Sequence, residues 1–172
     1  MMSSEEERSL VYLSPYSGES ISSYLGRWCR QEVVSIDTYT LGKRLRLGKT
    51  LWRWERFYLN PFPTRWELQK IDKLMDLGVD RLLLMFPPAN EPIVSPDTIR
   101  ICAACYTESP YHRMSWQYKS TEGCEHHRLR LLSKCPDPKC GELFPIPGKI
   151  TVLACKRCGM PYSAMAKKQK SY

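Results

Sequence analysis

The sequence lacks a long apolar run, an internal repeat and a low-complexity tract. Its longest uncharged apolar stretch, 82–89, holds eight residues and two prolines. A membrane-spanning helix needs about 18 apolar residues. The first nine residues, MMSSEEERS, are acidic where a secretory signal peptide is basic. We therefore expect a cytoplasmic protein without membrane association.

Signatures of catalysis are also missing. The sequence has no HExxH motif, no glycine-rich phosphate loop with its lysine, and no acidic cluster suited to two metal ions. The composition, 42% hydrophobic and 26% charged, is that of a globular chain rather than a disordered one. These observations predict a folded protein that is not an enzyme.

Cysteine, by contrast, is abundant: the chain has eight, and seven of them lie beyond residue 100. Disulfides are rare in the cytoplasm, so clustered cysteines there indicate metal binding. Two sets of four ligands follow in sequence order. The first is Cys102, Cys105, Cys124 and His127, and the second is Cys135, Cys140, Cys155 and Cys158.

The spacing of these residues favours zinc. Two ligands with two residues between them sit on one tight turn, and a distant second pair completes a tetrahedron. His127 is preferred over His126 because it gives this spacing. The alternative, scattered buried cysteines or a redox pair, is disfavoured because the two sets use all seven cysteines beyond residue 100 and leave none over. Four protein ligands leave no open position for water, so we expect two structural zinc ions rather than a catalytic one.

Short strands are predicted around these ligands. Alternating apolar residues predict a strand over 113–119 and another over 128–131. The stretches 142–146 and 149–154 flank a Pro-Gly pair and predict a hairpin between the knuckles of the second set, as in a zinc ribbon. Glycine after Cys140 and after Cys158 allows a positive φ there. Cys29 lies on an apolar helical stripe and is expected in the core.

The first half of the chain has helical periodicity. Helices are predicted from Ser20, from Ser35 or Asp37, from Thr50 and from Thr64, the last with a capping box to Glu67. A glycine turn at 78 and a short helix over 80–86 complete a helix-turn-helix outline. The last helix is apolar apart from Arg81, so we interpret the pair mainly as a packing unit rather than a reader of the DNA groove.

The fold class predicted is therefore a small α-helical, helix-turn-helix-like domain followed by a zinc-stabilised region with two tandem zinc-ribbon or knuckle modules. Prolines at 87, 88, 92 and 96 place the boundary. The predicted units are the helical domain 1–88, a proline-rich linker 89–98, a first zinc module 99–132, a second zinc module 133–164 and a basic tail 165–172.

A basic and aromatic segment spans 43–56. Its cations outnumber the single acid, Glu55, and are Lys43, Arg44, Arg46, Lys49, Arg53 and Arg56. Trp52 is expected to be exposed, whereas Trp54 should face inward with Leu51 and Tyr58. Cations contact phosphates, and exposed aromatics stack on unpaired bases or anchor a protein partner. The segment is thus a candidate partner surface. The alternative is an amphipathic stretch whose charges are only solvated.

The net charge of +8 agrees with an acidic or nucleic-acid partner. Residues 1–100 hold 14 Lys and Arg against 13 Asp and Glu, whereas residues 101–172 hold 12 against 5. Seven zinc-bound thiolates and two Zn²⁺ ions would lower the net charge of the chain to about +5. A modest basic surface remains.

The motifs together resemble the TniQ/TnsD family of transposition target-selection proteins over residues 10–162. The resemblance is carried by the helical part and by the order Cys102-x2-Cys105, Trp116, Cys124-x2-His127, Leu131-Leu132, Cys135-Pro136, Cys140-Gly141 and Cys155-x2-Cys158-Gly159. The short length is most similar to the TniQ of type V-K CRISPR-associated transposons. Longer members have further helical domains, so we expect this chain not to read an attachment site in duplex DNA alone.

The resemblance implies a role as a bacterial adaptor. Such a protein links an RNA-guided CRISPR effector, with its guide and tracrRNA, to the AAA+ ATPase TnsC, which recruits the transposase. A host ribosomal protein is a further candidate partner, and target DNA is contacted mostly indirectly. The alternative is a stand-alone helix-turn-helix and zinc-ribbon regulator that binds duplex DNA.

Overall fold

The computed structural model describes residues 11–172; the acidic first residues lie outside this range. The first half is helical: α2 (Ile21–Cys29), α3 (Thr38–Arg44), α4 (Thr50–Glu55), α5 (Arg65–Met75) and α6 (Val79–Leu83). The second half has short elements: α7 (Ala103–Glu108), the 3₁₀ turn η1 (Met114–Gln117), β1 (Gly123–Cys124), β2 (Leu129–Arg130), the 3₁₀ turn η2 (Pro147–Lys149) and α8 (Tyr162–Ala166). In the described part of the chain no helix is long and apolar enough to cross a membrane.

The helix starts follow their capping residues, with one exception. Ser20 and Asp37 accept hydrogen bonds from the backbone at the starts of α2 and α3, and the capping box of Thr64 with Glu67 is present. The predicted cap at Thr50 is wrong. Thr50 is the first residue of α4, and its hydroxyl donates to Glu67 Oε1 at 3.2 Å.

The helix-turn-helix outline is confirmed but is shorter than predicted. Asp76 ends α5 in the left-handed conformation, and Gly78 takes φ +87° before α6. The helix α6 stops at Leu83 instead of Phe86. Leu82 is buried, whereas Leu84 is 76% exposed. A five-residue helix offers few side chains to a DNA groove, whereas a helix that reads the major groove presents several to base edges.

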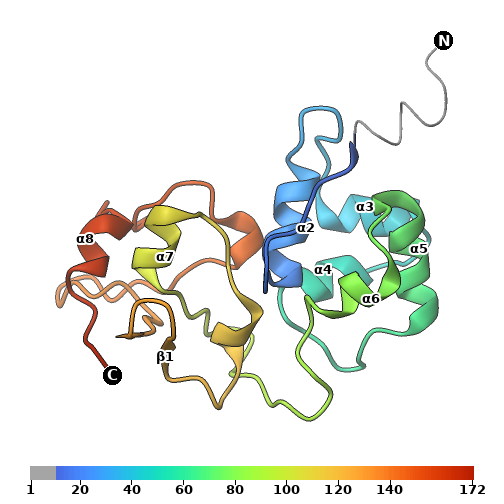
Figure 1. Cartoon of the computed structure of the whole chain (residues 1–172). Helices are drawn as coiled ribbons and strands as arrows, with labels where there is room; N and C mark the ends of the chain where they lie inside the picture. The colour runs from blue at the N-terminus through green and yellow to red at the C-terminus, as the bar shows by residue number, and fades with distance from the viewer. Residues whose placement is uncertain (1–10) are drawn as a thin grey trace.

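Helix α2 lies at the centre of the molecule (Figure 1), between the other helices and the cysteine-rich half. It packs against α4 on one side and η2 on another. Gly26 makes this approach possible, because a Cβ there would come within 2.3 Å of the Gly148 carbonyl oxygen. Gly148 N–H donates to Ser22 Oγ at 3.1 Å, so the second cysteine region docks directly on the helical half.

A second link between the halves is the buried His112. Its Nε2 donates to the Arg100 carbonyl at 3.0 Å, and its Nδ1 accepts from the Ser20 hydroxyl at 2.9 Å. Burial lowers the pKa of His112 to about 3, so the ring is neutral at pH 7. One apolar core continues through both halves and includes Cys29, as predicted.

Two of the predicted strand assignments are wrong. Residues 114–117 form the turn η1, because Gln117 is buried there and accepts from Arg100 N–H at 2.9 Å. The predicted hairpin over 142–154 is not formed. Its two arms pair with their own knuckles, at Lys134–Leu143 and Ala154–Pro161, and the Pro-Gly turn between them docks on α2. The strand expected over 128–131 is confirmed in part, as β2.

Candidate metal centres and the basic segment

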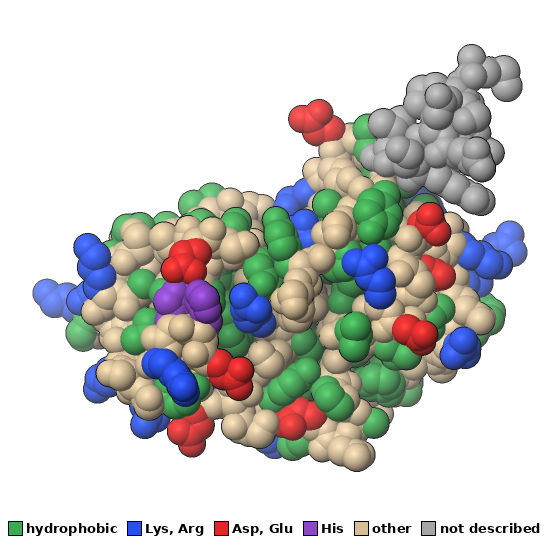
Figure 2. Space-filling view, viewed as in Figure 1, with side chains coloured by type: hydrophobic (Ala, Val, Ile, Leu, Met, Phe, Trp, Pro, Cys, Tyr) green, Lys and Arg blue, Asp and Glu red, His purple; other side chains and the backbone are tan. Residues whose placement is uncertain are grey.

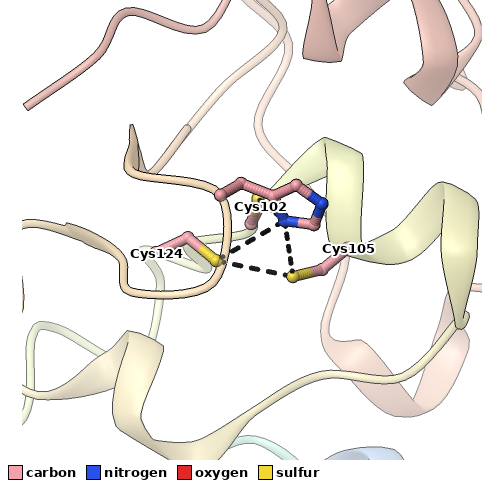
Figure 3. Close-up of side chains that lie close together, drawn as sticks. Cys102, Cys105 and Cys124 are labelled. Atoms are coloured by element: carbon pink, nitrogen blue, oxygen red, sulfur yellow. Dashed lines mark hydrogen bonds between the residues drawn. The ribbon is translucent and has the colours of Figure 1, made fainter.

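The first ligand set is brought together by three segments (Figure 3). Cys102 precedes α7, Cys105 lies in its first turn, Cys124 ends β1 and His127 follows in the turn to β2. Cys105 Sγ lies 3.4 Å from Cys124 Sγ and 3.3 Å from His127 Nδ1. Cys102 Sγ lies 3.8 Å from the same nitrogen. The four ligand atoms all lie within 4.8 Å of one another.

The imidazole of His127 is oriented by Glu108 at the end of α7. Its Nε2 donates to Glu108 Oε1 at 2.8 Å, so Nδ1 is the nitrogen that faces the thiols. This hydrogen bond holds the pKa of Glu108 below its ordinary value. A carboxylate behind a histidine ligand fixes its tautomer and raises its basicity. The role of Glu108 carried no spacing signal in the sequence. His126 is 65% exposed and lies beside the same carboxylate, and Figure 2 shows histidine beside acid on this face.

The second set is built from two knuckles. The Sγ atoms of Cys135 and Cys158 are 3.6 Å apart, and those of Cys140 and Cys155 are 3.7 Å apart. Gly141 and Gly159 have φ values of +61° and +74°, as the sequence predicted for the residue after each knuckle. Cys158 is exposed and Cys140 is partly exposed, whereas all three cysteines of the first set are buried.

Both sets fit a tetrahedral zinc ion. With a Zn–S bond of about 2.3 Å, the ligand atoms of a regular tetrahedron lie about 3.8 Å apart. Six pairs of ligand atoms in the two sets lie 3.3–3.9 Å apart. A disulfide would need about 2.05 Å between the sulfurs. Both clusters could therefore hold metal ions.

One thiol in each cluster has a lowered pKa, whereas the pKa values of its neighbours Cys105 and Cys135 are raised. Hydrogen bonds from Cys102 and Cys105 hold the pKa of Cys124 well below its ordinary value. Burial acts to raise the pKa of Cys155, but backbone N–H groups of its knuckle and the neighbouring thiols lower it to about 7. Burial instead raises the pKa of Cys29 to about 12. Metals bind thiolates, and the lowered pKa values of Cys124 and Cys155 favour one thiolate in each cluster.

The C-terminal residues support the first ligand set. The sequence analysis did not predict this role. Gln169 Oε1 accepts from the N–H of Ala103 at 2.9 Å, and its Nε2 donates to the Arg130 carbonyl at 2.8 Å. The ring of Tyr172 covers Gly123 so closely that a Cβ would come within 2.2 Å of it. The stretch predicted as a basic tail therefore holds the start of α7 and β1 in place.

The basic segment is divided in two by the fold. Lys43, Arg44, Arg46 and Lys49 are exposed at the end of α3 and before α4. Arg53 and Arg56 are half-buried: Arg53 donates to two backbone carbonyls, and Arg56 pairs with the buried Glu55 and covers the Trp52 ring at 4.3 Å. The first four cations are thus the ones open to a partner.

The aromatic residues of this segment follow the prediction in part. Trp54 is buried at 1% exposure, as predicted. Trp52 is half-buried and stacks on Tyr58 with ring centroids 6.2 Å apart. The inward position predicted for Tyr58 is wrong, since this side chain is 41% exposed. The chain takes a positive φ at Phe57, just after α4, and no longer follows the helical stripe.

Comparison with known proteins identifies the family. The model of the TniQ family matches residues 10–131, about 70% of the chain. The chain belongs to the TniQ family. TniQ proteins are a non-enzymatic family associated with transposition, in which they act as adaptors. No curated protein matches the chain. The matched span includes α2 to β2 and the first ligand set, and the second set lies beyond it.

Proposed function

We propose that this chain is an adaptor in RNA-guided DNA transposition. It links a target-bound CRISPR effector with its guide and tracrRNA, of type V-K, to a TnsC-type AAA+ ATPase, which recruits the transposase. A host ribosomal protein is a further partner, and target DNA is contacted mostly through the others. The observation that carries the proposal is the family match, which runs through the helical half and the first ligand set.

Both ligand sets hold zinc in this proposal. Cys102, Cys105, Cys124 and His127 would bind one ion, and Cys135, Cys140, Cys155 and Cys158 the other, as the fit of both sets to a tetrahedron supports. Zinc supplies a cross-link between short segments that have little core of their own. The protein's own contribution is to orient the ligands, through Glu108 and the glycines that follow the second-set knuckles.

The exposed cations of 43–49 form the proposed partner surface, together with Trp52 beside them. Charge reversal of Lys43, Arg44 and Arg46 should weaken assembly as added salt does, because exposed charges act within a Debye length of about 8 Å. Truncation of Trp52 should weaken assembly with less dependence on salt. Truncation of the buried Trp54 should lower stability, by about 3–5 kcal/mol for a large aromatic residue in the core.

Reconstitution tests the proposal. The purified chain is mixed with the ATPase, the RNA-guided effector and target DNA, and the assembly is followed by gel filtration and by integration of donor DNA. A complex that needs all components supports the adaptor. Specific nanomolar binding of the isolated chain to duplex DNA, with no binding to the ATPase, would instead support the stand-alone regulator. The five-residue α6 speaks against that outcome.

A further inference from the structure

A groove of about 600 Å³ has none of the basic residues of 43–49 in its lining. One wall is the loop after α4, with Tyr58 and Phe62, which are 41% and 40% exposed. The other wall is the segment after α6, with Ile93 and Val94, and Lys119 lies at its rim. Figure 1 shows both loops at the foot of the helical half. Specific ligand sites have volumes of about 300–1,000 Å³.

One wall of the groove contains an isolated β-bridge that lies outside the named strands. Ile93 forms an antiparallel bridge with Tyr118. The bonds of this bridge run from Val94 N–H to the Gln117 carbonyl and from Lys119 N–H to the Pro92 carbonyl, both at 2.8 Å. Along an extended strand, successive residues direct their N–H and C=O groups to opposite edges.

The N–H and C=O of Ile93 therefore point away from Tyr118. No hydrogen bond among residues 11–172 uses either group. Edges of this kind accept an added strand from a partner, through main-chain hydrogen bonds that give affinity and side-chain pockets that give specificity.

The side chains around this edge select the kind of peptide. The exposed rings of Tyr58 and Phe62 favour apolar side chains at alternate positions. Two charged residues line the groove, Glu91 and Lys119. The Glu91 carboxylate accepts a hydrogen bond from the Ser120 hydroxyl at 2.7 Å. Lys119 is exposed and takes part in none of the ion pairs of the described residues. A carboxylate on the incoming peptide would complement that ammonium group.

We propose that this groove binds an extended apolar segment of a partner protein, which pairs with Ile93 as an added strand and places a carboxylate at Lys119. This proposal takes one element from the proposed function, namely that the chain has a protein partner. The groove adjoins the proposed partner surface, because its Tyr58 stacks on Trp52, but none of the basic residues of 43–49 lines it.

Selection from a displayed library of random heptapeptides on the full, metal-loaded chain tests the groove without the transposition partners. We expect enriched peptides with apolar residues at alternate positions and at least one Asp or Glu. The winning peptide, made synthetically with a fluorescent label, gives the dissociation constant. Phe62→Ser should weaken its binding at least tenfold, and Lys119→Glu at least fivefold at low salt.

Matched controls lie outside the groove. Trp66→Ser removes a ring that is 56% exposed on α5, and Lys73→Glu reverses an exposed cation on the same helix. Both should leave peptide binding unchanged. Amide exchange supplies a readout that needs no variant: the Ile93 amide should exchange freely in the unliganded chain and become protected at least tenfold with peptide bound.

Four results would overturn the proposal. One is a library without an enriched family, and a second is a peptide that binds Phe62→Ser as tightly as the parent. A third is enrichment of proline-rich peptides that leave exchange at Ile93 unchanged. The last is occupation of the groove by oligothymidylate or by a second copy of the chain. It would be detected if Phe62→Ser abolished oligothymidylate binding or self-association. Failure of reconstitution with a positive peptide result would count against the adaptor role alone.

Discussion

The two cysteine clusters have the same ligand number but different surroundings. The first is part of the core: its cysteines are buried, and its module is joined to α2 through His112 and Ser20. The second is more exposed: Cys135 and Cys155 are buried in the same core, but Cys158 is exposed and Cys140 partly so. Its module is held to α2 by the contact of Gly148 with Gly26. The family match covers only the first. Two ligand sets of the same size can thus lie in different surroundings, one with all its cysteines buried and one partly exposed in a module docked on α2.

The largest expected difference is between ligand substitutions in the two clusters. Structural zinc contributes on the order of 10 kcal/mol in small modules. Cys105→Ser should lose one metal ion and unfold residues 99–132 together with the contacts of α2. Cys158→Ser should also lose one ion but open only residues 133–164. Cys29→Ser, the control, should keep both ions.

Metal content by native mass spectrometry and amide exchange by segment measure this difference. Equal loss of protection across the whole chain in both cysteine variants would contradict the distinction between a core cluster and a docked one.

Gly26→Val tests the docking contact itself. The added side chain meets the backbone of Gly148, so the second module must shift, and overpacking of this kind costs about 1–3 kcal/mol. We expect faster amide exchange over 142–154, unchanged exchange at the first cluster and two metal ions retained. Ser22→Ala is the milder companion, since it removes only the hydrogen bond to Gly148 N–H. If stability is unchanged in both variants, this contact does not hold the second module on α2.

His112 makes the link to the first cluster sensitive to pH. Its pKa of about 3 in the fold lies below the value of about 6.5 in the unfolded chain. The stabilisation is complete above pH 6.5 and is lost as the pH falls towards 3, by at most about 1.4 kcal/mol per pH unit. His112→Gln should lower stability at pH 7 and flatten this slope between pH 6 and 5. Urea unfolding at each pH measures the free energy of unfolding, and metal content is measured in parallel. If the slope of this free energy against pH is the same in the variant as in the parent, the assignment to His112 is wrong.

The smallest expected change in stability is at the basic segment. Reversal of Lys43, Arg44 and Arg46 should alter the free energy of unfolding by about 0.5 kcal/mol or less, because these side chains are exposed. Thermal unfolding and metal content check this. If the triple variant also assembles and transposes like the parent, the cations are only solvated, and the partner surface lies elsewhere on the chain.

The sequence predicted the features set by local spacing. Helical periodicity gave α2, α3 and α5, the capping box gave the start of α5, and ligand spacing gave both cysteine clusters. It could not give contacts between distant segments. The 142–154 arms fit a hairpin locally, but each pairs with its own knuckle and the turn between them docks on α2.

Long-range hydrogen bonds explain the other differences in the same way. The apolar alternation of 113–119 fits both a strand and a 3₁₀ turn, and burial of Gln117 against Arg100 selects the turn. Glu108 and Gln169 act on the first cluster from positions that no spacing rule connects to it. A single sequence shows which residues can bind a metal, whereas the residues that orient them are visible only in the fold.

X-ray absorption at the zinc edge, combined with the metal-to-protein ratio, tests the central claim most directly. Two closed structural sites predict two zinc ions per chain, with an average shell of 3.5 sulfur and 0.5 nitrogen ligands that follows from the two ligand sets. The Zn–S distance should be about 2.3 Å and the Zn–N distance about 2.0 Å. A ratio near one, or an oxygen ligand that indicates an open coordination position, would contradict it.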